Sequence, residues 1–112
     1  MKGIIYYLFI TLFAIPYAFA NSAGTDLNFY NCNNNNLTSI ILPNNSNLRY
    51  LSCYDNQLTS LDLSNQFELV ILNCERNFIS SLNVSNCINL FQLSCSSNQL
   101  TSLNISNNSL KR

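Results

Sequence analysis

The stretch LRYLSCYDNQLTSLDLSNQFE, residues 48–68, contains the pattern that decides the fold. Apolar residues occupy its first, fourth, sixth, eleventh, fourteenth and sixteenth positions, and Asn56 occupies the ninth. No helical period of 3.6 residues fits these spacings. The pattern is therefore not that of an amphipathic helix.

This pattern recurs along the chain at a period of 21 residues. It aligns four consecutive repeats, residues 27–47, 48–68, 69–89 and 90–110, which we number one to four. The ninth position is asparagine in all four, and the sixth is cysteine: Asn35, Asn56, Asn77 and Asn98; Cys32, Cys53, Cys74 and Cys95. Repetition at such a period indicates units that cannot bury their apolar face alone and must stack on one another.

The first eleven positions, as in residues 48–58, resemble the leucine-rich-repeat signature LxxLxLxxNxL, with cysteine in the third apolar position. Each repeat also divides into a first half of ten residues and a second half of eleven with similar patterns, which looks like the nested 21-residue class of bacterial leucine-rich repeats. The resemblance covers residues 27–110. It implies a leucine-rich-repeat solenoid, a right-handed superhelix of four coils, with a short parallel strand in each half and little or no helix.

The first twenty residues differ from the repeats. Lys2 is followed by an apolar run over 4–14, then Pro16 and the small-x-small sequence Ala18-Phe19-Ala20. This order predicts a secretory signal peptide over residues 1–20 and a mature chain that begins at Asn21. The remaining segments outside the repeats are a lead-in over 21–26 and a polar end over 111–112. An uncleaved membrane anchor is the alternative, because residues 4–20 approach the lower limit for a spanning helix.

Export predicts a secreted or cell-surface protein, periplasmic if the host is a Gram-negative bacterium. The charge is balanced, with five basic and five acidic side chains. This balance argues against nucleic-acid partners and, after signal cleavage, against anionic membranes. Histidine is absent, and no fixed carboxylate pair or metal motif stands in the sequence, so we predict a non-enzymatic protein without a cofactor.

The four cysteines of the sixth position are expected to be buried free thiols that pack as small apolar residues. Zinc needs four sulfurs about 2.3 Å from one ion, whereas residues stacked one per repeat span about 14 Å. Disulfides remain an alternative, although in-register neighbours lie about 4.8 Å apart and a disulfide needs Cβ atoms about 3.8 Å apart. Cys87 aligns with Asn45, Gln66 and Asn108, which favours a structural role.

The four asparagines of the ninth position are predicted to form a structural ladder, in which a buried side-chain amide bonds the backbone of adjacent repeats. Glycine and proline occur only twice each. We therefore expect asparagine to supply most of the turn residues with positive φ.

Positions whose residue stays the same in every repeat are expected to serve the stacking of the repeats, and positions whose residue varies are free for recognition. Exposed positions of the second half are monotonous, as in Thr59-Ser60 and Thr101-Ser102, whereas outward positions of the first half change in every repeat. Aromatic residues with an arginine and carboxylates are typical of protein-binding anchors. The candidate partner-binding residues are Phe29, Tyr50, Tyr54, Asp55, Ile71, Glu75 and Arg76. The alternative is that Phe29, Tyr50 and Ile71 merely cover their neighbours along one sheet column.

The predicted function is therefore protein binding through the variable face, with the partner unidentified. A structural unit that self-associates end to end is one alternative, and a fragment of a longer leucine-rich-repeat protein is another. Water ordering by the Thr-Ser columns is a further, weaker hypothesis.

Overall fold

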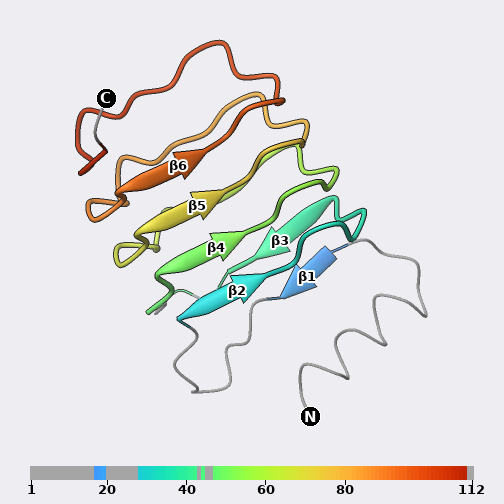
Figure 1. Cartoon of the computed structure of the whole chain (residues 1–112), viewed down its shortest axis with the longest axis horizontal. Helices are drawn as coiled ribbons and strands as arrows, with labels where there is room; N and C mark the ends of the chain where they lie inside the picture. Colours follow the sequence, from blue (N-terminus) through green and yellow to red (C-terminus); the bar gives the residue numbers. More distant parts are fainter. Residues whose placement is uncertain (1–16, 20–27, 43, 45–46, 111–112) are drawn as a thin grey trace.

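The computed structural model describes residues 17–19, 28–42, 44 and 47–110, and these contain six short strands and no helix. Four strands form one open parallel sheet in the order β2-β4-β5-β6, and two form a smaller parallel pair, β1-β3 (Figure 1). Their bounds are β1 Tyr17–Phe19, β2 Phe29–Asn31, β3 Ser39–Ile41, β4 Tyr50–Ser52, β5 Ile71–Asn73 and β6 Gln92–Ser94.

The register of the four-stranded sheet follows the sequence repeat. Tyr50 lies opposite Phe29 on one side and Ile71 on the other, and Ile71 lies opposite Gln92. Each pair is separated by one repeat, because parallel neighbours need a crossover and the rest of each repeat provides it. The expected parallel strands of the first halves are confirmed.

The expected strands of the second halves are wrong for repeats two to four. Among the described residues, β3 in repeat one is the only second-half strand, and it pairs with β1. Residues 60–62, 81–83 and 102–104, which correspond to β3, form no strand, and a turn follows them, as where the Gln66 N–H donates to the Leu63 carbonyl at 3.0 Å. Side-chain amides then join neighbouring repeats, as where Asn86 Nδ2 donates to the Ser64 carbonyl at 2.9 Å.

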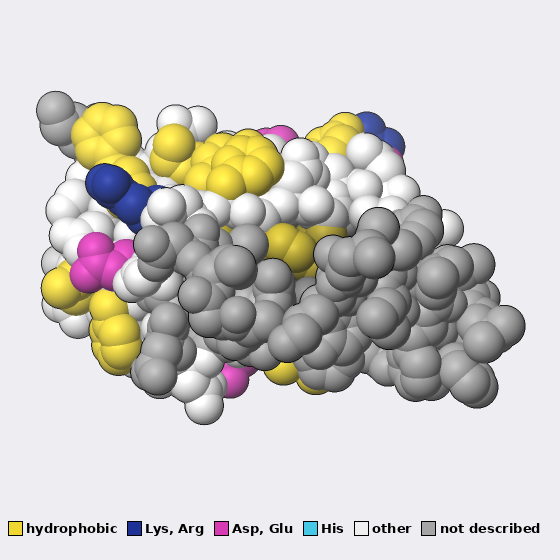
Figure 2. All heavy atoms as spheres, turned by 90° about the horizontal axis from the view of Figure 1, so that it is seen from below, with side chains coloured by type: hydrophobic (Ala, Val, Ile, Leu, Met, Phe, Trp, Pro, Cys, Tyr) yellow, Lys and Arg dark blue, Asp and Glu magenta, His cyan; other side chains and the backbone are white. Residues whose placement is uncertain are grey.

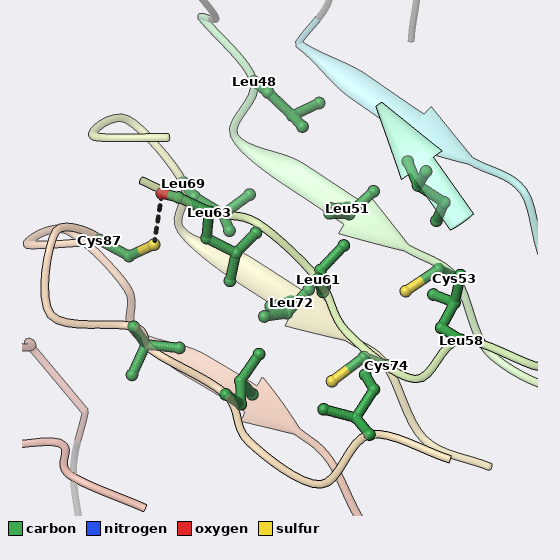
Figure 3. Packing of buried hydrophobic residues seen from close by; sticks show 14 of the residues in the cluster. Leu48, Leu51, Cys53, Leu58, Leu61, Leu63, Leu69, Leu72, Cys74 and Cys87 are labelled. Atoms are coloured by element: carbon green, nitrogen blue, oxygen red, sulfur yellow. Dashed lines mark hydrogen bonds between the residues drawn. The ribbon is translucent and has the colours of Figure 1, made fainter. Parts of the chain in front are cut away.

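The apolar columns of both halves point into one shared interior (Figure 3). Leu51 and Leu72 behind the sheet are fully buried, and so are Leu58 and Ile79. The equivalent residues of repeat four, Leu93, Cys95, Leu100, Leu103 and Ile105, are only partly buried. An inner repeat has a neighbour on each side, whereas the last has one. Because a fully enclosed leucine contributes about 1.5–3 kcal/mol, repeats two and three supply most of the apolar stabilisation.

The ninth-position asparagines connect consecutive repeats through their side-chain amides. Asn56 Nδ2 donates to the carbonyls of Cys32 and Cys53, at 2.9 and 3.0 Å. Asn56 Oδ1 accepts from the N–H groups of Asn35 and Leu37, at 3.0 and 2.9 Å. One side chain therefore satisfies backbone groups of its own repeat and of the repeat before it.

The ladder has a direction. Asn77 Nδ2 donates back to the Cys53 carbonyl at 3.0 Å, and Asn98 Nδ2 donates back to the Cys74 carbonyl at 2.9 Å. Asn35 belongs to the first repeat, is exposed, and its Nδ2 donates to the carbonyl of Asn33 within the same repeat. Asn35 therefore does not make the backward contacts to a preceding repeat that Asn56, Asn77 and Asn98 make.

The residue before each ladder asparagine has a left-handed backbone. Asn34, Asp55, Arg76 and Ser97 have φ of 57°, 57°, 55° and 54°, and Asn36 has 55°. Only two of these five residues are asparagine, so the expectation that asparagine supplies most positive φ values is wrong for the described residues. The ladder amide also bonds the carbonyl two residues back, as from Asn77 Nδ2 to Glu75 at 3.2 Å, and so the turn constrains the residue between them whatever its type.

We predict that Asn77→Ala lowers the free energy of unfolding by about 1–3 kcal/mol, because it leaves buried backbone groups without their partners. Asn35→Ala is the matched control. It is expected to change the free energy of unfolding by less than about 0.5 kcal/mol, as other surface substitutions do. Urea unfolding followed by circular dichroism measures both. Equal losses would contradict the directional ladder.

We predict that Ser97→Asn stabilises the fold by up to about 1 kcal/mol, because asparagine tolerates the left-handed backbone better than serine. Ser106, which is also exposed in repeat four but is not among the positive-φ residues, provides the control Ser106→Asn. Thermal unfolding of the two variants makes the comparison. A Ser97→Asn variant no more stable than the control would show that residue 97 carries no such strain.

Candidate functional site

The outward face of the sheet carries a row of three apolar side chains, Phe29, Tyr50 and Ile71, which we call the ring row. Successive strand residues point to opposite faces. The first residues of β2, β4 and β5 therefore share the outward face and lie in register. The rings of Phe29 and Tyr50 stack with centroids 4.4 Å apart and planes 7° apart. Phe29 is 57% exposed, and Tyr50 and Ile71 are half-buried, so the row presents apolar surface to solvent.

A second group lies just beyond the strands, in the turns that follow β4 and β5. It consists of Tyr54, Asp55, Glu75 and Arg76, and we call it the loop cluster. Arg76 Nη1 donates to the Tyr54 hydroxyl at 3.2 Å, and the guanidinium carbon lies 5.7 Å from the centre of the Tyr54 ring. Arg76 Nε lies 3.8 Å from Asp55 Oδ1. The left-handed turns place Asp55 and Arg76 at equivalent positions of neighbouring repeats.

The contacts of the loop cluster orient side chains more than they stabilise the fold. The Arg76 and Asp55 side chains are 59% and 45% exposed, and exposed ion pairs contribute about 0–1 kcal/mol. Glu75 is held separately, since its Oε1 accepts a hydrogen bond from Ser96 Oγ at 2.6 Å. Four polar groups are thus held in defined positions while the Arg76 guanidinium stays accessible.

Two residues outside the seven candidates, Asn33 and Ser52, lie beside the loop cluster. Asn33 Oδ1 accepts from Ser52 Oγ at 2.8 Å and from the Tyr54 N–H at 2.7 Å. Ser52 is only 1% exposed, although it lies on the same outward face of β4 as Tyr50. Asn33 therefore positions Tyr54 from the neighbouring repeat. No spacing in the sequence signals this contact.

The structure thus places all seven candidate residues on or beside one sheet, in two groups. Phe29, Tyr50 and Ile71 form the row, and the other four form the cluster at the ends of the strands. Figure 2 shows one side of the molecule, on which charged side chains are few and hydrophobic side chains form separate patches among uncharged polar atoms.

The five cysteines are free thiols, and four of them are buried. Burial raises the pKa of Cys32 and Cys74 to about 12 and that of Cys87 to about 11. The pKa of Cys53 is raised by burial and further by the thiols of Cys74 and Cys32. Because the thiolate is the nucleophile and the metal ligand, these thiols behave as neutral apolar groups.

Hydrogen bonds also hold the thiols in place. The Sγ atoms of Cys32 and Cys53 each donate to a carbonyl of the following repeat at 3.6 Å. Cys87 Sγ donates to the Leu63 carbonyl at 4.0 Å (Figure 3). Within the described part of the chain, no three histidine, cysteine, aspartate or glutamate side chains are grouped so that they could hold a metal ion.

No family model matches this chain, and neither a curated protein nor a solved structure does. A separate finding concerns membranes: in residues 17–19, 28–42, 44 and 47–110, no helix is long and apolar enough to span one.

We predict that stability falls as the pH rises above about 9. Below the ordinary thiol pKa of 9.0, the thiols are protonated in both the folded and the unfolded state, and their full contribution to stability is present. Above it the unfolded chain loses protons that the folded chain keeps, because the folded pKa of Cys74 is about 12. Each such thiol lowers the free energy of unfolding by up to about 1.4 kcal/mol for each pH unit between its unfolded and its folded pKa.

Urea unfolding at several values between pH 8 and 10.5 measures this slope. Cys74→Ala is expected to lower stability at every pH and to reduce the slope by the contribution of one thiol. An unchanged slope in Cys74→Ala would contradict a thiol that stays protonated in the folded state.

Proposed function

We propose that this chain is a non-enzymatic, exported leucine-rich-repeat solenoid that binds a protein partner through the ring row and the loop cluster. Three features support the solenoid. The strands recur in register once per 21 residues, the signature leucines lie inside, and the signature asparagines bond consecutive repeats.

The observation that carries the binding proposal is the exposed Phe29–Tyr50 stack in the same face as the Arg76–Tyr54 contact. Tyrosine, arginine and buried aromatic anchors dominate binding energy in protein interfaces. The ring row and loop cluster also occupy the half of the repeat in which outward residues vary, so the stacking of the repeats does not require these residues.

A cover for neighbouring side chains is a weaker account of the ring row. Such a cover would leave little of the outermost ring in solvent, yet more than half of Phe29 is exposed. The strands behind the row are fixed by backbone hydrogen bonds and by the ladder, so the face is rigid before binding. A rigid face loses little conformational entropy on association.

The partner we propose is a protein segment with an apolar side chain for the ring row and a hydrogen-bond acceptor or carboxylate for Arg76. Asp55 neutralises that guanidinium only in part, because the two groups meet at 3.8 Å with both exposed. The near-zero charge of the chain favours neither nucleic acid nor an anionic membrane as partner.

The proposed export signal lies mostly outside the described residues. Tyr17–Phe19 is described, and it forms β1 against β3 in the whole chain. Cleavage after Ala20 would therefore release this strand, and the partner is sought outside the cytoplasm.

The test is site-specific photo-cross-linking in the cells that make the protein. A benzophenone side chain at Tyr50, in the ring row, is expected to give one discrete protein adduct. The same probe at Ser60, exposed in the second half of that repeat, is expected to give none. Equal adducts from both positions would overturn the proposed face.

Arg76→Ala is expected to reduce the Tyr50 adduct about tenfold or more, in line with the loss of an interface anchor. Arg49→Ala removes another exposed arginine and is the matched control, expected to leave the adduct unchanged. Alanine keeps a Cβ atom, so Arg76→Ala does not relieve the left-handed backbone strain at residue 76. An adduct insensitive to Arg76→Ala would exclude the loop cluster from the site.

A further inference from the structure

The two ends of the row of repeats are unlike each other. At the last repeat, the interior is open to one side, and Leu93, Cys95, Leu100 and Leu103 line a hollow there. Their counterparts one repeat earlier, such as Leu72 and Ile79, are fully buried because repeat four covers them. The uncovered end of repeat four is therefore a shallow surface on which these apolar side chains are reached by solvent.

The asparagine ladder gives this end specific hydrogen-bonding positions. In repeat three, the Cys74 carbonyl accepts from two amides, Asn77 at 3.2 Å and Asn98 at 2.9 Å. In repeat four, the Cys95 carbonyl accepts from Asn98 at 3.1 Å. The second donor would have to come from a ladder asparagine placed beyond repeat four.

The first repeat carries such an asparagine. Asn35 is exposed, and within the described part of the chain its side-chain amide donates to the nearby Asn33 carbonyl at 2.9 Å. It occupies the ninth position, which in repeats two to four reaches back to the preceding repeat. The donor missing at one end of the molecule is thus present at the other.

A strand of the chain itself covers part of the first end. β1 pairs with β3 in parallel, with Ala18 opposite Ile40 (Figure 1). This is the side of repeat one on which the second half of a preceding repeat would lie. β3 therefore accepts a parallel neighbour, and β1 occupies that place in the whole chain.

We infer that repeat four of one copy docks on repeat one of a second copy, head to tail, once β1 has been removed. The internal register continues across the joint: Gln92 lies opposite Phe29 and Leu93 opposite Tyr30 of the second copy. Asn35 of the second copy donates to the Cys95 carbonyl and accepts from the Leu100 N–H. This inference uses the two ends of the described row of repeats. It shares Phe29 with the proposed binding face, but its test measures the association of the chain with itself and not the capture of another protein.

We propose a second copy of this chain as the partner because the surface that covers repeat four must present two apolar columns and one side-chain amide at the spacing of the 21-residue repeat. Every intramolecular junction between repeats shows this match. Head-to-tail joints between unlike ends leave a free end on each pair, so association should continue beyond a dimer, into a ring or an open array.

The test begins with the folded full chain carrying a protease site between residues 20 and 21. Light scattering is expected to show a monomer before cleavage and, after cleavage and loss of the β1 peptide, a mass that rises with concentration. Circular dichroism follows the fold throughout. A cleaved chain that stays monomeric, or that loses its spectrum, would overturn the inference.

Direction is tested with Leu103→Asp, which places a charge in the open end of repeat four. Cleaved Leu103→Asp and uncleaved parent chain are each expected to remain monomeric, and mixing them is expected to give one-to-one pairs. Pairing of the uncleaved parent with itself would instead indicate a symmetric contact between two repeat-four ends and would overturn the head-to-tail joint.

Asn35→Ala provides a variant expected to leave the monomer intact, since Asn35 makes no backward contact among the residues that the structure describes. After cleavage it is expected to weaken association about tenfold, whereas Asn83→Ala, exposed in repeat three, is expected to leave it unchanged. Equal association of the two variants would exclude Asn35 from the joint, whether or not Leu103→Asp folds.

Discussion

The structure depends on one interaction, the bond between a side-chain amide and the backbone of the preceding repeat. A chain that turns every few residues around a narrow interior leaves N–H and carbonyl groups there, and each needs a partner. Asn56 and Asn77 supply both a donor and an acceptor from one compact group. A leucine at either position could fill the volume but would leave these backbone groups unsatisfied.

The ladder also determines where function can lie. Because leucines, cysteines and ladder asparagines fill the interior, variation is confined to outward positions. The outward positions of β2, β4 and β5 stand on strands fixed from behind, which is the arrangement that holds Phe29 and Tyr50 in a stack. The loop cluster follows from the same turns, since the left-handed residue before each ladder asparagine brings Arg76 beside Tyr54 and Asp55.

Sequence reasoning succeeds where a property repeats and fails where it depends on one contact. The 21-residue spacing of leucine and cysteine predicts the register of the sheet and the buried columns. It does not predict that Asn33 positions Tyr54, because that contact joins two repeats at positions where their residues differ. Nor does it reveal the positive φ of Arg76 and Ser97, because the ladder imposes that conformation on whatever residue stands there.

The second halves show a related limit. Their pattern resembles that of the first halves, yet Gln66, Cys87 and Asn108 replace the invariant asparagine. β3 is a strand because β1 pairs with it, and the corresponding residues of repeats two to four, 60–62, 81–83 and 102–104, have no such partner among the described residues.

The direction of the ladder has a consequence for assembly. A symmetric dimer through two repeat-four ends would bring together two Cys95 carbonyls and no ladder donor. A dimer through two repeat-one ends would leave the Cys95 carbonyl of each copy without a second donor. Only the head-to-tail arrangement puts the exposed amide of one end beside the available carbonyl of the other. A buried polar group without a partner costs about 1–3 kcal/mol, so the backbone itself disfavours the symmetric alternatives. In the proposed assembly, the bond that joins the repeats within one chain would therefore also join two chains.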